Sequence, residues 1–132
     1  MNIASVDIGL KRIGFATCLV DNIILSAPAI IRKNRNQAAK EISQLLKEKH
    51  IELLVVGLPK GGNSEEEMGR RIKHFVSLLE FGGKIVYQDE YGTSEEAKEK
   101  LKGITKQKKD GKVDSIAASL ILQRWIESMQ SI

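Results

Sequence analysis

The order of the apolar segments constrains this chain more than any other feature of its sequence. Three short runs rich in Ile, Val and Ala, at residues 2–8, 13–20 and 23–31, follow one another with only short turn segments between them. From residue 35 onward, segments with helical periodicity alternate with further apolar runs. An antiparallel meander followed by alternating helices and strands predicts an α/β fold, with a mixed sheet and helices on both of its faces.

The second part of the chain predicts four helices and two more strands, which makes the sheet five-stranded. We expect the strands at residues 52–57 and 84–88, and the helices at residues 35–49, 64–80, 93–102 and from 112 onward. Asn34 is a suitable N-cap, and Ser64 and Thr93 each precede a glutamate by three residues, which is the spacing of a capping box. Residues 103–111 are polar and contain two glycines, so we expect a mobile loop there. Pro28 predicts that the third strand lies at an edge of the sheet or ends there.

A chain of 132 residues fits one domain, and we expect residues 1–132 to form it. A domain of this length buries roughly two-thirds of its unfolded surface, so it needs no metal ion or disulfide to stay folded. The single cysteine, Cys18, falls in an apolar run, where we expect a small buried thiol. His50 and His74 are far apart in sequence, which argues against a zinc site made of His and Cys. Neither a signal peptide nor an apolar segment of membrane-spanning length is present, so we expect a cytoplasmic protein with no membrane contact.

The positive charge of the chain is concentrated in one segment. The net charge is +4, and residues 98–112 alone carry +5, because that window holds seven lysines and two acids. The lysines are Lys98, Lys100, Lys102, Lys106, Lys108, Lys109 and Lys112. Localised positive charge suits a polyanion such as a nucleic acid, but a solvated lysine-rich loop has the same composition. Aromatic residues make up only 5% of the chain, which argues against a platform that stacks several bases.

Acidic residues follow the ends of two predicted strands and begin the last helix. Asp7 lies near the end of the first strand, Asp89 and Glu90 follow the last strand, and Asp114 starts the terminal helix. In open α/β sheets, ligands bind outside the carboxyl ends of the strands, so these acids are expected at one edge. Carboxylates brought together repel one another, and a divalent cation such as Mg²⁺ or Mn²⁺ resolves that conflict. Taken singly, Asp89 or Glu90 could begin a turn and Asp114 could be a helix N-terminal charge, whereas Asp7 is harder to explain structurally.

The turn after the first strand reads Gly-Leu-Lys-Arg-Ile-Gly at residues 9–14. Its glycines permit a tight reversal and a close approach of the backbone to a ligand. Lys11 and Arg12 place two cations beside the expected metal site, where a phosphate could bind. Two other interpretations remain open, a solvated hairpin tip and the phosphate loop of a sugar-kinase or actin-like ATPase.

With these motifs, the chain resembles the YqgF/RuvX family of ribonuclease H-like proteins. The matching segments appear in the family's order and read Val-Asp-Ile-Gly at 6–9, Lys-Arg-Ile-Gly at 11–14, Val-Val-Gly-Leu-Pro at 55–59, Asp-Glu at 89–90 with Thr-Ser at 93–94, and Asp-Ser-Ile-Ala-Ala at 114–118. The resemblance implies a ribonuclease H-like five-stranded mixed sheet and a metal-dependent nuclease site. Members are associated with maturing the 5′ end of the small-subunit (16S) ribosomal RNA precursor, and they were also proposed to resolve Holliday junctions.

Carried over residue by residue, the resemblance implies three catalytic acids. Asp7 matches the metal ligand of the first strand, Glu90 with Asp89 beside it matches the family's Asp-Glu-Arg motif, and Asp114 matches the acid of the terminal helix. The chain departs from the family where Tyr91 and Gly92 replace Arg and Leu, so the cation of that motif is missing. The loop after Pro59 also departs from the family, because it lacks the usual Met-Asp.

Together, the candidate residues and the resemblance predict a metal-dependent nuclease that acts on structured RNA, and the resemblance implies precursor ribosomal RNA as its substrate. Asp7, Glu90 and Asp114 are the expected catalytic and metal-binding residues, with Asp89 as an alternate metal ligand. The residues expected to bind nucleic acid are Lys11, Arg12, Lys106, Lys108, Lys109 and Lys112. Two alternatives remain, a DNA junction resolvase that would have to be a homodimer, and a nucleic-acid-binding assembly factor without catalysis. An ATP-dependent phosphotransferase fits least, because 132 residues leave no room for a second nucleotide-closing domain.

Overall fold

The computed structural model describes residues 1–20, 23–59, 65–89 and 112–130, with the side chains of the last segment described from 115 to 129. Its strands are β1 (Ile3–Ile8), β2 (Arg12–Val20), β3 (Ile23–Ile31), β4 (Leu53–Leu58) and β5 (Lys84–Asp89), and its helices are α1 (Arg35–Glu48), α2 (Glu65–Ser77) and α4 (Lys112–Gln130). The predicted helix at 93–102 and the predicted loop at 103–111 lie outside the described residues. All other predicted elements are found, with boundaries that differ by up to three residues.

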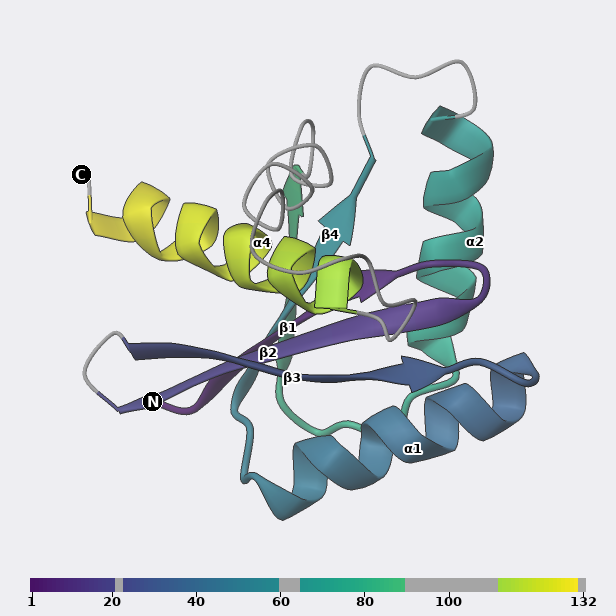
Figure 1. Cartoon of the computed structure of the whole chain (residues 1–132), viewed down its shortest axis with the longest axis horizontal. Helices are drawn as coiled ribbons and strands as arrows, with labels where there is room; N and C mark the ends of the chain where they lie inside the picture. The colour runs from purple at the N-terminus through teal and green to yellow at the C-terminus, as the bar shows by residue number, and fades with distance from the viewer. Residues whose placement is uncertain (21–22, 60–64, 90–111, 131–132) are drawn as a thin grey trace.

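The five strands form one mixed sheet in the order β3-β2-β1-β4-β5 (Figure 1). β2 pairs antiparallel with both β1 and β3, while β4 pairs parallel with both β1 and β5. The predicted meander and the predicted mixed sheet are therefore both confirmed. β1 is the central strand, and five consecutive residues of β4 are buried, as a continuous apolar run predicts for a strand covered on both faces.

Helices cover both faces of the sheet, as predicted. In Figure 1, α4 lies on one side of the strands, and α1 and α2 lie on the other. Alternate residues of β1 separate the two layers: Ala4 and Val6 enter the larger core beneath α1 and α2, while Ser5 faces α4. The Ser5 hydroxyl is fully buried and donates a 2.6 Å hydrogen bond to the carbonyl of Ala118, which ties α4 to the central strand.

The N-terminus of α1 is capped by Asn34, as predicted. The Asn34 side-chain oxygen accepts a 2.8 Å hydrogen bond from the backbone N–H of Gln37, and the Gln37 side chain accepts from the backbone N–H of Asn34 at 3.2 Å. This reciprocal pair is a capping box with Gln37 at the third helical position, whereas the sequence predicted only the Asn34 cap. The Ser64 and Thr93 caps lie outside the described residues.

The helix predicted to run to residue 80 ends at Ser77. The backbone N–H groups of Leu78 and Leu79 bond to the carbonyls of Phe75 and Val76, three residues earlier, at 3.0 and 3.1 Å. The last turn is therefore tighter than an α-helix, which is a common way for a helix to end. Helical periodicity in the sequence does not distinguish these two patterns over a single turn.

Pro28 lies in β3, which is an edge strand of the sheet. This confirms the prediction that a proline, which has no backbone N–H, marks a strand at the edge. The strand does not end there, but continues to Ile31. Its register against β2 shifts by one residue between the pairs Ile13–Ile30 and Phe15–Ala27, so Pro28 falls in an irregular segment where one ladder bond is dispensable.

The lone cysteine lies where its apolar run predicts. Cys18 is buried in the core between the sheet and α4. Phe75 of α2 is buried in the core on the other face of the sheet, and Trp125 of α4 packs, partly buried, against the same core as Cys18. Among the helices that the structure describes, none is long and apolar enough to cross a membrane.

Candidate functional site

Asp7 lies at the carboxyl end of the central strand, on the face that α4 covers. It is half-buried, two residues beyond Ser5 on the same face of β1. Asp7 pairs with Gly14 of β2. On the other side, Val6 pairs with Val56 of β4, so the next residue, Gly57, lies beside Asp7. Because both neighbouring positions lack a side chain, neither adjacent strand places one beside the Asp7 carboxylate.

The first turn of α4 lies toward the same edge. The carbonyl of Ala118 accepts a hydrogen bond from the Ser5 hydroxyl. The Ser115 hydroxyl donates to the carbonyl of Ala27, and Ala27 is level with Val6 in the sheet, one residue closer to Asp7 than Ser5 is. α4 therefore advances toward the carboxyl end of β1 as it is followed back to its N-terminus. Asp114 directly precedes Ser115 in this turn, and its side chain lies outside the described residues. The backbone places Asp114 at the edge where the sequence predicts it.

Asp89 is the last residue of β5 and lies on the other face of the sheet. It pairs with Leu58, which packs against the core beneath α1 and α2, and paired residues of a parallel ladder point to the same side. Asp89 therefore points away from the face that carries Asp7, and it is exposed. Glu90 lies outside the described residues. Among the side chains that are described, no group of three His, Cys, Asp or Glu could hold a metal ion.

The turn between β1 and β2 has the tight geometry expected from its glycines. The N–H of Gly9 donates a 3.0 Å bond to the carbonyl of Arg12, and a Cβ at Gly9 would lie 2.7 Å from that oxygen, so a larger residue would force the turn to shift. Lys11 is exposed and Arg12 is half-buried. The carbonyl of Lys11 accepts a 2.8 Å bond from the N–H of Arg32, which joins this turn to the end of β3. Lys106, Lys108 and Lys109 lie outside the described residues, as does the side chain of Lys112.

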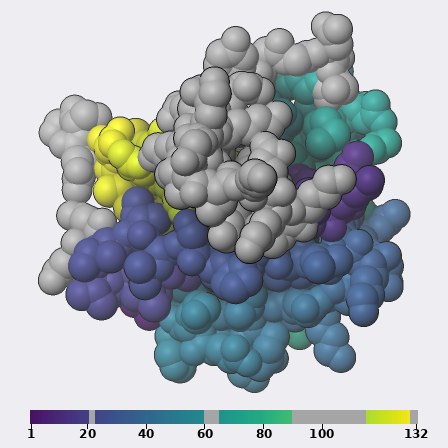
Figure 2. Space-filling view, viewed as in Figure 1, coloured from purple at the N-terminus to yellow at the C-terminus, as the bar shows by residue number. Residues whose placement is uncertain are grey.

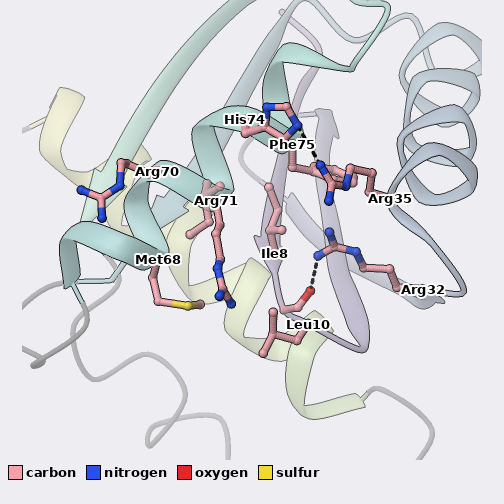
Figure 3. Close-up of a pocket in the computed structure, with 11 residues that line it drawn as sticks. Ile8, Leu10, Arg32, Arg35, Met68, Arg70, Arg71, His74 and Phe75 are labelled. Carbon is pink, nitrogen blue, oxygen red and sulfur yellow. Dashed lines mark hydrogen bonds between the residues drawn. The ribbon is translucent and has the colours of Figure 1, made fainter.

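A basic cavity that the sequence analysis missed opens on the α1 and α2 side of the same sheet edge (Figure 3). It has a volume of about 440 Å³. Its basic lining residues are Arg32, Arg35, Arg70, Arg71 and His74, and the rest of the lining includes Ile8, Gly9, Leu10, Met68, Ile72 and Phe75. The basic residues come from two segments far apart in the sequence. No local sequence motif indicates that they form one cluster. The only local signals are that Arg32 and Arg35 lie near the start of a helix and that Arg70 and Arg71 are adjacent.

The side chain of Arg32 is held in place by a hydrogen bond and by an aromatic ring. Its Nη1 donates a 2.9 Å hydrogen bond to the carbonyl of Gly9, and its guanidinium lies 5.1 Å from the ring centre of Phe75. Burial, and secondly the nearby charge of Arg35, lower the pKa of Arg32 below its ordinary value. An Nη1 of Arg35 lies 3.0 Å from the Nε2 of His74, which links the two walls of the cavity.

Comparison with known protein families gives one match over almost the whole chain. Residues 1–128 match the family model described as "RuvX: Holliday junction resolvase". A protein of Sulfurovum sp. (strain NBC37-1) named "Putative pre-16S rRNA nuclease" is 60% identical over 124 residues, which cover 94% of this chain and 97% of that protein. A protein of Campylobacter jejuni subsp. doylei with the same name is 56% identical over 130 residues, which cover 98% of this chain and 100% of the relative.

Solved structures share the fold at low sequence identity. The T. thermophilus RuvC in complex with a Holliday junction superposes with a TM-score of 0.64 and 13% identity, covering 97% of this chain and 96% of that one. The Fowlpox virus resolvase in complex with Holliday junction DNA gives a TM-score of 0.61 and 18% identity, covering 98% and 99%. These similarities establish that the fold is ribonuclease H-like, as the sequence analysis predicted.

Proposed function

The chain belongs to the RuvX family, and we propose that it is a metal-dependent nuclease that matures the 5′ end of the small-subunit (16S) ribosomal RNA precursor. The observation that carries this proposal is the position of Asp7, at the carboxyl end of the central strand between two glycines, with the first turn of α4 at the same edge. The names of the relatives that are more than 50% identical supply the RNA substrate. We further propose that residues 1–132 act as one nuclease domain, and that the protein works in the cytoplasm.

Asp7, Glu90 and Asp114 are the proposed metal-binding and catalytic residues. Carboxylate oxygens are the ligands that Mg²⁺ and Mn²⁺ prefer, and the glycines beside Asp7 fit the need for space around such an ion. Bound divalent ions supply a hydroxide nucleophile near neutral pH and stabilise the leaving oxygen of the phosphodiester. The carboxylates fix where that chemistry occurs, while Lys11 and Arg12 at the adjacent turn contact phosphates of the substrate.

The placement of Asp89 favours Glu90 as the metal ligand contributed by the end of β5. Asp89 shares its face of the sheet with Leu58 and is separated from Asp7 by the sheet itself. A carboxylate on that face cannot share an ion with Asp7 unless the strand end turns over. Asp89 therefore becomes the weaker of the two candidates.

A second candidate function is the resolution of four-way DNA junctions, which the description of the matching family favours. Two symmetric cuts require two active sites, so this activity predicts a stable homodimer. A third candidate, nucleic-acid binding without catalysis, is disfavoured because all three predicted catalytic acids are present in the sequence.

A cleavage assay with both substrates distinguishes these functions. We expect the protein with Mn²⁺ to cut a precursor ribosomal RNA 5′ segment and to leave a four-way DNA junction intact. Recognition through the RNA backbone and its A-form shape, rather than through base stacking, gives only modest sequence preference. Symmetric cutting of the junction by a dimer, with the RNA left whole, would show that the resolvase function is the correct one. Tight binding of the RNA without any turnover would instead favour the non-catalytic factor.

The lysines of residues 98–112 are proposed to supply non-specific affinity for nucleic acid. Changing Lys106, Lys108 and Lys109 to Gln should weaken binding to all sequences alike. Each lost phosphate contact should reduce the slope of log K against log salt by about 0.7 on single strands and about 0.9 on B-form DNA. Fluorescence anisotropy across a salt series measures this slope. The matched control changes three exposed lysines away from the site, Lys40, Lys47 and Lys84, to Gln. Equal slopes for the two triple variants would show that the segment is a solvated loop.

A further inference from the structure

The arginine-lined cavity concentrates positive charge, with four arginines and a histidine among its lining residues. In Figure 3, Arg71 on α2 lies on one side of Ile8, and Arg32 and Arg35 lie on the other, while Arg70 points away from them. No aspartate or glutamate is among the described residues that line the cavity. The ion pair between Arg71 and Glu67 is 2.8 Å long, but both side chains are more than half exposed, so solvent screens it.

The guanidinium groups are held in place before any ligand binds. Arg32 is fixed by its hydrogen bond to Gly9 and by the ring of Phe75, and the described hydrogen bonds of this side chain use one of its five N–H donors. Arg35 is fixed by its contact with His74. Since the charge of Arg35 lowers the pKa of Arg32, the two cations repel each other, and a bound anion would relieve that repulsion.

Phosphate is the anion that this arrangement fits best. Guanidinium groups form paired hydrogen bonds with phosphate oxygens, and several converging arginines are typical of phosphate recognition. The volume of about 440 Å³ admits a phosphate together with its sugar. Apolar side chains of Ile8, Leu10 and Met68 complete the lining and could pack against that sugar.

The cavity is adjacent to the proposed catalytic edge along the chain itself. Ile8 and Gly9, which line it, directly follow Asp7. Two residues of a strand span about 7 Å, so a nucleotide strand bound at Asp7 reaches the cavity within a few nucleotides. The space-filling view shows the turn after β1, in purple, at the surface between α2 and the segment that joins β3 to α1 (Figure 2).

We propose that this cavity is a second phosphate-binding subsite, which holds a phosphate of the substrate strand while the bond to be cleaved lies at Asp7. The inference rests on the proposed nuclease function for the identity of the strand. The same chemistry would accept an internal phosphodiester or the 5′-terminal phosphate of an RNA. Arg32 and Arg35 bind this phosphate from one wall and Arg71 from the other.

The test compares three proteins in a binding assay that needs no catalysis. They are the wild type, the double variant Arg35→Gln/Arg71→Gln, and the control Lys40→Gln/Lys47→Gln, which removes the same charge from exposed positions on α1. Arg32 is left intact because it supports the turn after β1. Circular dichroism checks that each protein is folded. Affinity for single-stranded RNA, with a 5′-phosphate or a 5′-hydroxyl, is measured by anisotropy with EDTA across a salt series.

We expect the cavity variant to bind RNA about tenfold more weakly than the control, with a salt slope lower by about 0.7, the value for one phosphate. A loss seen with both RNAs identifies an internal phosphodiester, and a loss seen only with the 5′-phosphorylated RNA identifies the terminal phosphate. Affinities and slopes equal to those of the control overturn the subsite, whatever the protein cleaves. A wild type that binds in this way but never cleaves RNA would overturn the proposed function and leave the subsite standing.

Discussion

Replacing Asp7 with Asn should abolish metal-dependent cleavage while the protein stays folded. Asn has nearly the same shape as Asp, so the packing of β1 against α4 is kept, but one negative charge and one metal ligand are lost. A contribution of about 4 kcal/mol to the transition state corresponds to a loss of about a thousandfold in rate. The measurement is the rate of cleavage of the precursor RNA segment at saturating Mg²⁺ or Mn²⁺.

The control for this experiment removes one negative charge far from the carboxyl edge of the sheet. Glu48 is exposed at the end of α1, shortly before β4 begins, so Glu48→Gln should cleave at the wild-type rate. Thermal unfolding without metal should show that Asp7→Asn melts at or above the wild-type temperature, because a like charge is removed from an acidic site. Cleavage retained by a folded Asp7→Asn protein at saturating metal would contradict the assignment of the metal site.

The sheet could be predicted from the sequence because its pattern is local. The three closely spaced apolar runs and the continuous apolar segment before Pro59 each carry the signal of their own strand, and short connections fix which strands are neighbours. The position of Asp7 at a strand end followed from the same pattern. Helix ends were less certain, because the final turn of α2 keeps the periodicity of a helix while its hydrogen bonds change.

The arginine cavity could not be predicted, because nothing local in the sequence unites its parts. Arg32 acquires its role only when the end of β3 is brought beside Gly9, and Arg71 faces it only because α2 packs over the same end of β1. The choice between Asp89 and Glu90 was open for a related reason. The face on which Asp89 lies depends on the register of β5 against β4, which the sequence does not show.

The register makes that choice testable, with a large expected difference between two adjacent substitutions. Asp89 pairs with Leu58 on the side of α1 and α2, so Asp89→Asn removes a charge from the face opposite Asp7. Glu90→Gln removes the acid that we propose as the metal ligand. We expect Glu90→Gln to lower the cleavage rate about a thousandfold, as for Asp7→Asn, and Asp89→Asn to lower it less than about tenfold.

The two variants are matched controls for each other, because each removes one carboxylate and keeps the shape of the side chain. The dependence of the rate on Mn²⁺ concentration adds a second readout. Loss of a metal ligand should raise the Mn²⁺ concentration needed for half-maximal rate in Glu90→Gln, whereas Asp89→Asn should keep the wild-type value. The reverse order of effects would mean that the end of β5 turns over when metal and substrate bind, so that Asp89 reaches the face of Asp7. Equal and severe losses in both variants would mean that both acids hold the ions, which would contradict the assignment of Glu90 alone.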